Sequence, residues 1–472
     1  MNDERCQLHS HLMGIGGIGM SAVAQVLAVG GERVSGCDLR ASPLTAKLER
    51  LGIRFSEGHS PDHLAGIERL VVSDAIKPDN PELRAARERG VPVLRRSELV
   101  GELMRDRRGI AVAGTHGKTT ITAMVGLILA RMGLDPTVLI GGELPQFGGN
   151  ARVGRGKFFV AEACEAYESF LDLEPEIAII ANIQAEHLDH HGSEDALIES
   201  FGSFVARVRP HGTLVCCADD PNASAVAARA ASNVVSYGVE TRSDYRALDV
   251  ADDGMGMSYT LAHPQGRTPA RLPIPGRHSV ANALGAIATC ASAGVGPEGS
   301  AAILESYRGV ERRFQVTMTA AGVTVVDDYA HHPTEIRAVI AAARPRCQGK
   351  LVVVFQPHLY SRTRDFLEGF ADSLAAADRV LVTEVYAARE EPLVGIGGNS
   401  VVEALRRRGE EEAEFRPQKD DVAQPLAESL SGGDWVLVLG AGDIGSVAQD
   451  LVEKLGRLAP GKAEEGRPLC TP

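Results

Sequence analysis

Short apolar runs alternate with segments of helical spacing along most of the chain, and the runs usually stop at a glycine or a charged residue. They fall at residues 9–15, 33–37, 68–72, 110–113, 157–161, 176–183, 213–217, 323–326, 351–355, 379–385 and 435–439. Runs of this length predict buried strands, and the segments between them predict the helices that connect parallel strands. The pattern therefore predicts an α/β protein.

The 472 residues amount to about three domains of ordinary size. We divide them into domains at 1–105, 106–314 and 315–456. The remaining segment, 457–472, contains Gly, Pro, Lys and Glu with few apolar residues. Such a composition is typical of a disordered tail.

A glycine-rich turn follows the first predicted strand. It reads Gly14-Ile-Gly16-Gly17-Ile18-Gly19, and the next strand ends at Asp38. Strand, Gly-x-Gly-x-x-Gly turn, helix, strand and acid is the layout of dinucleotide-binding folds. The same turn can hold the diphosphate of NAD or of a UDP-sugar, and a βαβ unit without a ligand also stays open. Ser73 follows another strand, where ligands bind in open α/β sheets.

A second glycine loop carries the strongest signal for phosphate binding. The run 110–113 stops at Gly114-Thr115-His116-Gly117-Lys118-Thr119-Thr120, which opens a helical segment. Backbone N–H groups, the helix dipole and a lysine together bind phosphate, and a hydroxyl after the lysine can ligate Mg²⁺. The loop is shorter than the standard P-loop. The sequence therefore predicts a variant nucleotide-binding loop with Lys118 and Thr119 at its centre.

Carboxylates and histidines follow the neighbouring strands of this central domain. Glu162 and Glu165 follow the run at 157–161, and Glu186-His187-Leu188-Asp189 follows the run at 176–183. If these strands are parallel neighbours, Glu162 and His187 reach the same sheet edge as Lys118, and they can hold Mg²⁺ beside the phosphates. The alternatives are a surface acid and a solvated turn. Zinc is disfavoured because the spacing of the histidines at 187, 190 and 191 lacks the usual patterns.

Composition narrows the classes of function. The net charge of −13 argues against a general nucleic-acid binder, which would carry a basic stripe. The sequence shows neither an apolar run of about 20 residues nor a leader-like N-terminus, so we expect no membrane insertion. Eight cysteines occur without a Cys-x-x-Cys pair. We expect reduced, buried thiols and a cytoplasmic protein.

The last predicted domain collects polar residues after its strands. Residues 327–335 read Asp-Asp-Tyr-Ala-His-His-Pro-Thr-Glu, and residues 356–364 read Gln-Pro-His-Leu-Tyr-Ser-Arg-Thr-Arg. A second Gly-x-Gly-x-x-Gly turn spans Gly440–Gly445. For this turn we favour a close strand–helix packing turn over a nucleotide site.

Taken in order, these motifs resemble the Mur ligases of peptidoglycan synthesis. The resemblance rests on the turn at 14–21, the loop at 114–120, Glu162 with Glu165, 186–189, 278–282, 312–314, 327–335, 356–363 and 440–444. It covers nearly the whole chain except the tail, and it implies a Rossmann-like domain at 1–105, a central P-loop ATPase-like domain at 106–314 and a second Rossmann-like domain at 315–456. The segment 327–335 points to the alanine-adding branch. The resemblance implies an ATP- and Mg²⁺-dependent ligase that activates the lactyl carboxylate of UDP-N-acetylmuramate as an acyl phosphate and joins it to L-alanine.

The resemblance also implies roles for individual residues. Catalytic roles fall to Lys118, His187, His331 and Arg362, and the Mg²⁺ ligands are Thr119, Glu162 and His187. The ATP contacts are Gly114, Thr115, His116, Gly117, Lys118, Thr119, Thr120, Asn282, Arg313 and Asp328. The UDP-sugar contacts are Gly16, Gly17, Ile18, Gly19, Asp38 and Ser73, and the amino-acid contacts are Tyr329, His331, His358 and Arg362.

The sequence departs from the family pattern in places. Ser279 stands where the family often has Asn, Leu359 where it often has Arg, and Asp74 where it usually has Ser. Three alternatives to the alanine ligase stay open. They are the related ligase that attaches a tripeptide to UDP-N-acetylmuramate, a nicotinamide-dependent oxidoreductase, and a UDP-sugar sensor without catalysis. Oligomeric state does not follow from the sequence.

Overall fold

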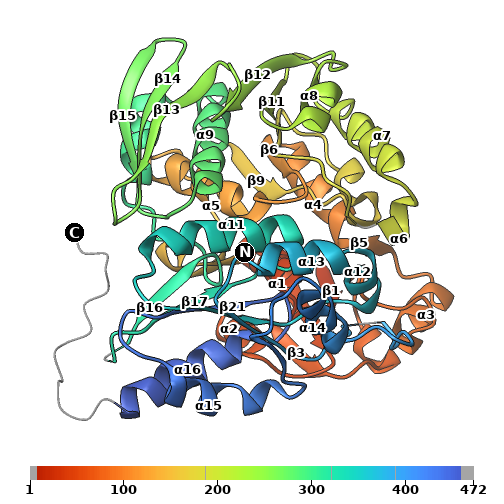
Figure 1. Cartoon of the computed structure of the whole chain (residues 1–472). Helices are drawn as coiled ribbons and strands as arrows, with labels where there is room; N and C mark the ends of the chain where they lie inside the picture. The colour runs from red at the N-terminus through yellow and green to blue at the C-terminus, as the bar shows by residue number, and fades with distance from the viewer. Residues whose placement is uncertain (1–7, 187, 320, 389, 459–472) are drawn as a thin grey trace. The chain divides into compact units, whose positions relative to one another are not determined.

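Glycine turns and helix caps stand at several of the junctions between strands and helices. The computed structural model describes residues 8–186, 188–319, 321–388 and 390–458. Figure 1 labels many of the elements and colours the chain from red at the N-terminus to blue at the C-terminus. By density of contacts the chain forms two units. The first contains residues 1–249, 259–271 and 280–307, and the second contains 250–258, 272–279 and 308–472.

The first sheet is parallel, in the order β3-β2-β1-β4-β5. Its strands are β1 (His9–Met13), β2 (Arg33–Asp38), β3 (Arg54–Glu57), β4 (Arg69–Val72) and β5 (Val93–Arg95). The helical elements of this part are α1 (Ile18–Val29), α2 (Pro43–Arg50), η1 (Pro61–Leu64), α3 (Pro81–Glu88) and α4 (Arg96–Arg105). Apolar residues of α1 and α4 fill one core, and α3 and η1 cover a second, smaller core. Strand order reverses at β1, where open sheets bind ligands.

The second sheet has the order β15-β14-β13-β12-β11-β10-β6-β9-β7-β8. Its strands are β6 (Arg108–Ala113), β7 (Thr137–Leu144), β8 (Gly149–Arg152), β9 (Phe158–Glu162), β10 (Ile177–Ile180), β11 (Thr213–Cys217), β12 (Asn233–Gly238), β13 (Tyr245–Asp252), β14 (Met257–His263) and β15 (Gly266–Leu272). Strand β6 lies between β10 and β9 and is parallel to both. The loops after these three strands therefore meet at one sheet edge.

The connections of the second sheet include long and short helices. They are α5 (Lys118–Arg131), η2 (Pro145–Phe147), η3 (Ala166–Asp172), α6 (Leu188–His191), α7 (Glu194–Val205), α8 (Pro221–Ala227), α9 (Arg277–Ser292) and α10 (Pro297–Leu304). Ser193 caps α7 and Asp220 caps α8 by accepting backbone N–H groups. Helix α1 packs on β7 and β8 of this sheet. There Asn150 Nδ2 donates to Ser21 Oγ at 2.8 Å.

The third sheet has the order β16-β17-β21-β18-β19-β20, with β16 antiparallel. Its strands are β16 (Gln315–Met318), β17 (Thr324–Asp328), β18 (Leu351–Phe355), β19 (Arg379–Val382), β20 (Ala413–Phe415) and β21 (Trp435–Leu439). The helical elements are α11 (Pro333–Ala343), η4 (Arg344–Arg346), α12 (Tyr360–Asp365), α13 (Leu367–Leu374), α14 (Gly398–Arg407), η5 (Lys419–Asp421), α15 (Ala423–Ser429) and α16 (Gly445–Leu458). Cores fill both faces, with α11, α13 and α14 on one and α15 and α16 on the other.

Each of the eleven apolar runs overlaps one strand, which accounts for 11 of the 21 strands in the described residues. The predictions at 213–217, 351–355 and 435–439 coincide with β11, β18 and β21, whereas the run at 176–183 shortens to Ile177–Ile180. The domain limits at 105, 314 and 456 stay a prediction. Of the predicted tail, residues 459–472 lie outside the described residues. Within the described part of the chain, no helix combines the length and apolarity needed to cross a lipid bilayer.

Candidate active site

The loop between β6 and α5 is clamped to the end of β10. Asn182 Oδ1 accepts the N–H of His116 at 2.8 Å, and Asn182 Nδ2 donates to the His116 carbonyl at 3.2 Å. The Thr115 N–H donates to the Asn182 carbonyl at 3.0 Å, and the Thr115 hydroxyl donates to the Gln184 carbonyl at 3.2 Å. These contacts fix the loop in one conformation before any ligand binds.

Glycine is required at both ends of this loop. Gly114 has φ +136° and Gly117 has φ +83°. A Cβ on Gly114 would lie 3.1 Å from the backbone N of Ala181, and a Cβ on Gly117 would lie 2.5 Å from Asn282 Oδ1. A side chain at either position would therefore meet strand β10 or helix α9. The loop forms a close-fitting cradle at the start of a helix, which suits the phosphates of a nucleotide.

Lys118 is held by a buried carboxylate. Its Nζ donates to the carbonyl of Thr115 at 3.1 Å and to the two oxygens of Glu165 at 3.0 and 2.9 Å. Glu165 is 1% exposed. Burial lowers the pKa of Lys118, but the Glu165 carboxylate outweighs it and the pKa lies above its usual value. The cation is therefore charged and directed toward the loop at neutral pH.

The two carboxylates after β9 have different surroundings. Glu165 pairs with Lys118, whereas Glu162 accepts the N–H of Gly141 from β7. Thr119 stands in the first turn of α5 and is largely buried. Glu162 and Thr119 offer the oxygen ligands that Mg²⁺ prefers. His187 lies outside the described residues, so its predicted place beside the metal stays a prediction.

The first glycine turn is also held by a neighbouring strand. The Gly16 N–H donates to Asp38 Oδ2 at 2.9 Å, and a Cβ on Gly14 would lie 3.0 Å from Ser73 Cβ. The structure thus brings together the predicted Asp38, Ser73 and glycine residues at the point where strand order reverses. Helix α1 begins at Ile18, so its first-turn N–H groups open toward this turn.

In the second unit, the four residues predicted for the amino acid lie together. Arg362 Nη1 donates to His358 Nδ1 at 3.0 Å. The rings of His331 and His358 are 6.0 Å apart, and the rings of Tyr329 and His331 are 5.5 Å apart. His331 Nδ1 lies 2.9 Å from the carbonyl of Tyr329, so this nitrogen carries the proton. In a neutral ring the lone pair then lies on Nε2.

Asp328 forms hydrogen bonds with the backbone beside this cluster. Its carboxylate accepts the N–H groups of Phe314 and Ala330 at 2.6 and 2.7 Å, one on each oxygen. Burial raises the pKa of Asp328 to about 6, although Arg313 opposes the shift. The Arg313 guanidinium lies 5.1 Å from the centre of the Tyr329 ring. Asp328 thus positions the segments that carry Arg313 and Tyr329, and its predicted contact with ATP stays a prediction.

The second Gly-x-Gly-x-x-Gly turn is occupied by side chains of its own unit. A Cβ on Gly442 would lie 2.4 Å from Gln356 Oε1 and 2.6 Å from Tyr386 Cγ. Arg312 donates to the carbonyls of Gly440 and Gly442 at 2.7 and 3.1 Å. The turn is packed closely against β18 and the segment after β19, as expected of a strand–helix packing turn.

Comparison with known families covers most of the chain. Residues 9–108 match the Mur ligase family, catalytic domain; residues 112–290 match the Mur ligase middle domain; and residues 312–442 match the Mur ligase, glutamate ligase domain. A UDP-N-acetylmuramate–L-alanine ligase of Xanthomonas oryzae pv. oryzae is 46% identical over 450 residues, which is 94% of each chain. The chain belongs to the Mur ligase family.

Solved structures of other Mur ligases agree with this fold. The UDP-N-acetylmuramate–alanine ligase of Thermotoga maritima superposes with a TM-score of 0.81 at 32% identity and covers 96% of this chain and 100% of its own. A murein peptide ligase of Psychrobacter arcticus gives a TM-score of 0.74 at 25% identity, with 95% and 99% covered. This Mur ligase therefore has the three-domain α/β architecture expected from its sequence.

Three residues that lie beside the two glycine turns of this Mur ligase were not singled out from its sequence. Asn182 and Gln184 hold the phosphate loop, and Arg96 lies against α1, since a Cβ on Gly19 would be 3.4 Å from Arg96 Nη1. An arginine beside a helix N-terminus suits a diphosphate. The available signal was a polar residue, Asn182, inside the apolar run at 176–183. Nothing in the sequence marks Arg96.

Proposed function

We propose that this chain is an ATP- and Mg²⁺-dependent ligase that joins L-alanine to the lactyl carboxylate of UDP-N-acetylmuramate. The observation that carries the proposal is the 46% identity, over 94% of the chain, to a ligase whose name states these substrates. The charged Lys118, held by Glu165 inside a glycine loop, supports the use of ATP. The cluster of Tyr329, His331, His358 and Arg362 supports an amino-acid site.

The chemistry explains why such residues are needed. A carboxylate is a poor electrophile because the group that leaves would be oxide, and a phosphoryl group from ATP turns it into an acyl phosphate with a good leaving group. Lys118 neutralises negative charge on the phosphoryl group as it moves. Glu165 keeps the Lys118 ammonium charged and in place. Thr119, Glu162 and His187 are the residues that would hold Mg²⁺, which adds further charge neutralisation.

The amino-acid end needs a cation and a base. Arg362 can bind the carboxylate of L-alanine through two parallel N–H groups. The attacking amine must lose a proton, and His331 can accept it at Nε2 because its Nδ1–H is donated to the Tyr329 carbonyl. In the first unit, Asp38, Ser73 and residues 16–19 would hold the UDP moiety at the turn after β1.

The test is ADP release from the purified full-length chain. ADP formation should require UDP-N-acetylmuramate and L-alanine together, with an amide formed for each ADP. In competition, alanine should be used in preference to the tripeptide L-Ala-γ-D-Glu-meso-diaminopimelate. A preference for the tripeptide would assign the chain to the recycling branch. ADP release without amide formation would overturn the ligase proposal.

A matched pair of lysine variants tests the loop. Lys118→Met should lower kcat about 10²–10³-fold, because it removes one charge directed at the phosphoryl group. Lys157→Met removes an exposed lysine beside β9 and should leave kcat unchanged. Equal activity of the two variants would refute the role of Lys118.

A further inference from the structure

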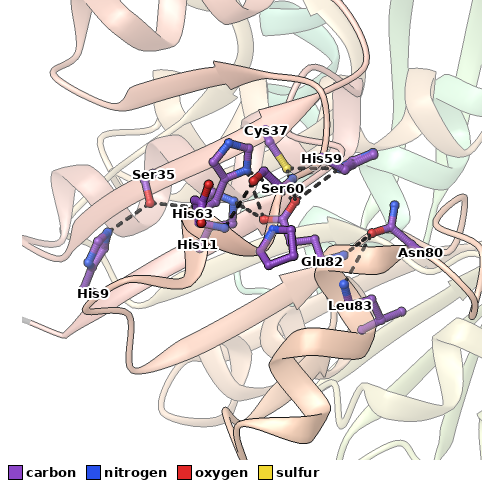
Figure 2. Close-up of polar contacts among 12 residues, drawn as sticks. His9, His11, Ser35, Cys37, His59, Ser60, His63, Asn80, Glu82 and Leu83 are labelled. Carbon is purple, nitrogen blue, oxygen red and sulfur yellow. Dashed lines mark hydrogen bonds and ion pairs between the residues drawn. The ribbon is translucent and has the colours of Figure 1, made fainter.

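Four side chains with metal-binding atoms meet in the first unit, away from the phosphate loop. They are His11 on β1, Cys37 on β2, His63 in η1 and Glu82 on α3. One ligand atom from each lies within 4.8 Å of the other three. Figure 2 shows the four side chains directed toward one another, with His59 beside them. Within the described residues, this is the one such group of His, Cys, Asp and Glu.

Glu82 lies at the centre of this group and is fully buried. Its carboxylate is 3.0 Å from His11 Nε2, 3.3 Å from the nearest nitrogen of His63 and 3.3 Å from Cys37 Sγ. Asn80 caps α3 by accepting the Glu82 N–H at 2.9 Å, which fixes where the helix starts and therefore where Glu82 points (Figure 2). The carboxylate is thus held in place by its own helix.

The tautomer of His11 follows from a chain of hydrogen bonds on its far side. His9 Nδ1 lies 2.9 Å from the Gly66 carbonyl, which only accepts, so Nδ1 carries the proton. In a neutral ring the lone pair then lies on Nε2, which accepts the Ser35 hydroxyl at 3.0 Å. The Ser35 oxygen must then accept from His11 Nδ1, which is 2.8 Å away.

This tautomer leaves the lone pair of neutral His11 on Nε2, which faces Glu82. Among the described residues, neither His11 Nε2 nor Glu82 Oε1 has a partner with the geometry of a hydrogen bond, although the two atoms are 3.0 Å apart. Two lone-pair atoms at this distance repel each other unless a cation lies between them. A proton on His11 or a metal ion would remove the repulsion. The hydrogen bond from Nδ1 to Ser35 is the outer partner that metal-bound histidines usually have.

The structure assigns these four residues as a zinc site. One thiolate, two imidazoles and one carboxylate are donors that Zn²⁺ accepts in tetrahedral geometry, whereas Mg²⁺ and Ca²⁺ prefer oxygen alone. The separations of 3.0–3.3 Å around Glu82 are close to the roughly 3.4–3.8 Å between ligands of a tetrahedral zinc ion. The charges balance as well, because Zn²⁺ with one thiolate and one carboxylate is neutral, and a neutral centre is the one that burial favours.

Binding of Zn²⁺ would release protons from the ligands to solvent. Without metal, the Cys37 thiol keeps its proton and donates it to Glu82 Oε2 at 3.3 Å. Zn²⁺ would form a Zn–S bond as this proton leaves to solvent. If His11 were an imidazolium, its Nε2 proton would leave too. With a closed set of four protein ligands the site is structural, because it leaves no open position for a substrate.

The site also touches the first glycine turn. The Cys37 carbonyl accepts the N–H groups of Gly14 and Ile15 at 2.8 and 3.1 Å, and Asp38 follows directly. Zinc would thus tie α3 and η1 to the strand end that supports this turn. Weaker binding of the UDP substrate after zinc removal is a consequence that rests on the proposed function. Binding of zinc itself does not rest on it.

Metal stoichiometry of the full-length chain tests the assignment. Protein stripped with a chelator and titrated with ZnCl₂ should retain one tightly held zinc per chain after desalting, and Cys37→Ser and His63→Gln should each lose it. Cys347→Ser removes a thiol of the second unit, and His59→Gln removes the adjacent histidine. Both should keep the zinc. No retained zinc in the wild type, or retention by Cys37→Ser, would overturn the proposal.

Cobalt provides a readout that separates ligation from folding. Co²⁺ bound to the wild type should give a thiolate-to-metal charge-transfer band in the near ultraviolet, and Cys347→Ser should retain it. Cys37→Ser should lose the band while its circular dichroism matches that of the metal-free wild type. A band that survives Cys37→Ser, or disappears in Cys347→Ser, would contradict ligation by Cys37. Ligase activity plays no part in either measurement, so the zinc site and the proposed function can fail separately.

Discussion

The hydrogen bonds by which Asn182 holds the phosphate loop allow a quantitative prediction of ATP affinity. Asn182→Ala removes two hydrogen bonds to His116, at 2.8 and 3.2 Å, in a half-buried position. At about 1 kcal/mol for each bond, the clamped conformation loses about 2 kcal/mol relative to other loop conformations. ATP must then restore the clamped conformation on binding, so its affinity should fall about 30-fold, at 1.4 kcal/mol for each factor of ten.

Calorimetric titration of the full chain with a non-hydrolysable ATP analogue and Mg²⁺ measures this affinity. Asn399→Ala is the control, because it removes a single exposed hydrogen bond, to Glu403, in the second unit. Binding of the UDP substrate should stay unchanged in both variants. ATP affinity within about threefold of wild type for Asn182→Ala would show that the loop keeps its conformation without the clamp, and the reasoning would fail.

Other outcomes follow from single contacts. Arg362→Ala should raise KM for L-alanine about 10–100-fold and leave KM for ATP unchanged, because it removes a charge-assisted hydrogen bond; initial rates at varied alanine measure this. Glu165→Gln should move the alkaline limb of the pH–rate profile to lower pH, because burial still lowers the pKa of Lys118 and the opposing carboxylate is gone; an unmoved limb would contradict the pairing. Asp328 has a folded pKa of about 6 against an ordinary value of 3.8, so the folded chain holds an extra proton between these values and stability falls as pH rises through them. Between pH 4 and 7, the stability of Asp328→Asn relative to the wild type should therefore rise by about 2 kcal/mol, and the loss of one backbone contact lowers it equally at both pH values. Thermal unfolding midpoints at the two pH values measure it, and a difference between the two proteins that does not change with pH would refute it.

The sequence predicted the places where strands end better than the contacts made there. Apolar runs mark buried parallel strands, and the polar residues that follow them must gather at one edge of the sheet. For that reason Lys118, Ser73 and His358 could be placed after the carboxyl ends of strands without a structure. The sequence could not say whether Glu162 or Glu165 is the closer metal ligand, because both follow β9 and differ only in the turn between them. The structure shows that Glu165 pairs with Lys118 and that Glu162 accepts the Gly141 N–H.

Contacts between segments that lie far apart in the chain could not be predicted from the sequence. The cluster of His11, Cys37, His63 and Glu82 joins four segments with no motif spacing, so only the folded sheet and α3 bring it together. Cys37 was predicted to be a buried, reduced thiol like the other cysteines. The structure adds that its sulfur lies 3.3 Å from both Glu82 and His59, a surrounding that apolar flanking residues do not indicate.

The two glycine turns of the first unit have one feature in common, and it limits which of their N–H groups can bind phosphate. In each turn a side chain from the neighbouring strand end takes one loop N–H: Asp38 accepts from Gly16, and Asn182 accepts from His116. Those N–H groups hold the turn and are engaged by the protein. If phosphate binds at these turns, as we propose, its oxygens would be met by the first-turn N–H groups of α1 and α5, which have no acceptor within their own helix, and by the cations Arg96 and Lys118. Substitutions at Asp38 or Asn182 should thus act through the shape of the turn, whereas those at Arg96 or Lys118 should remove charge directly.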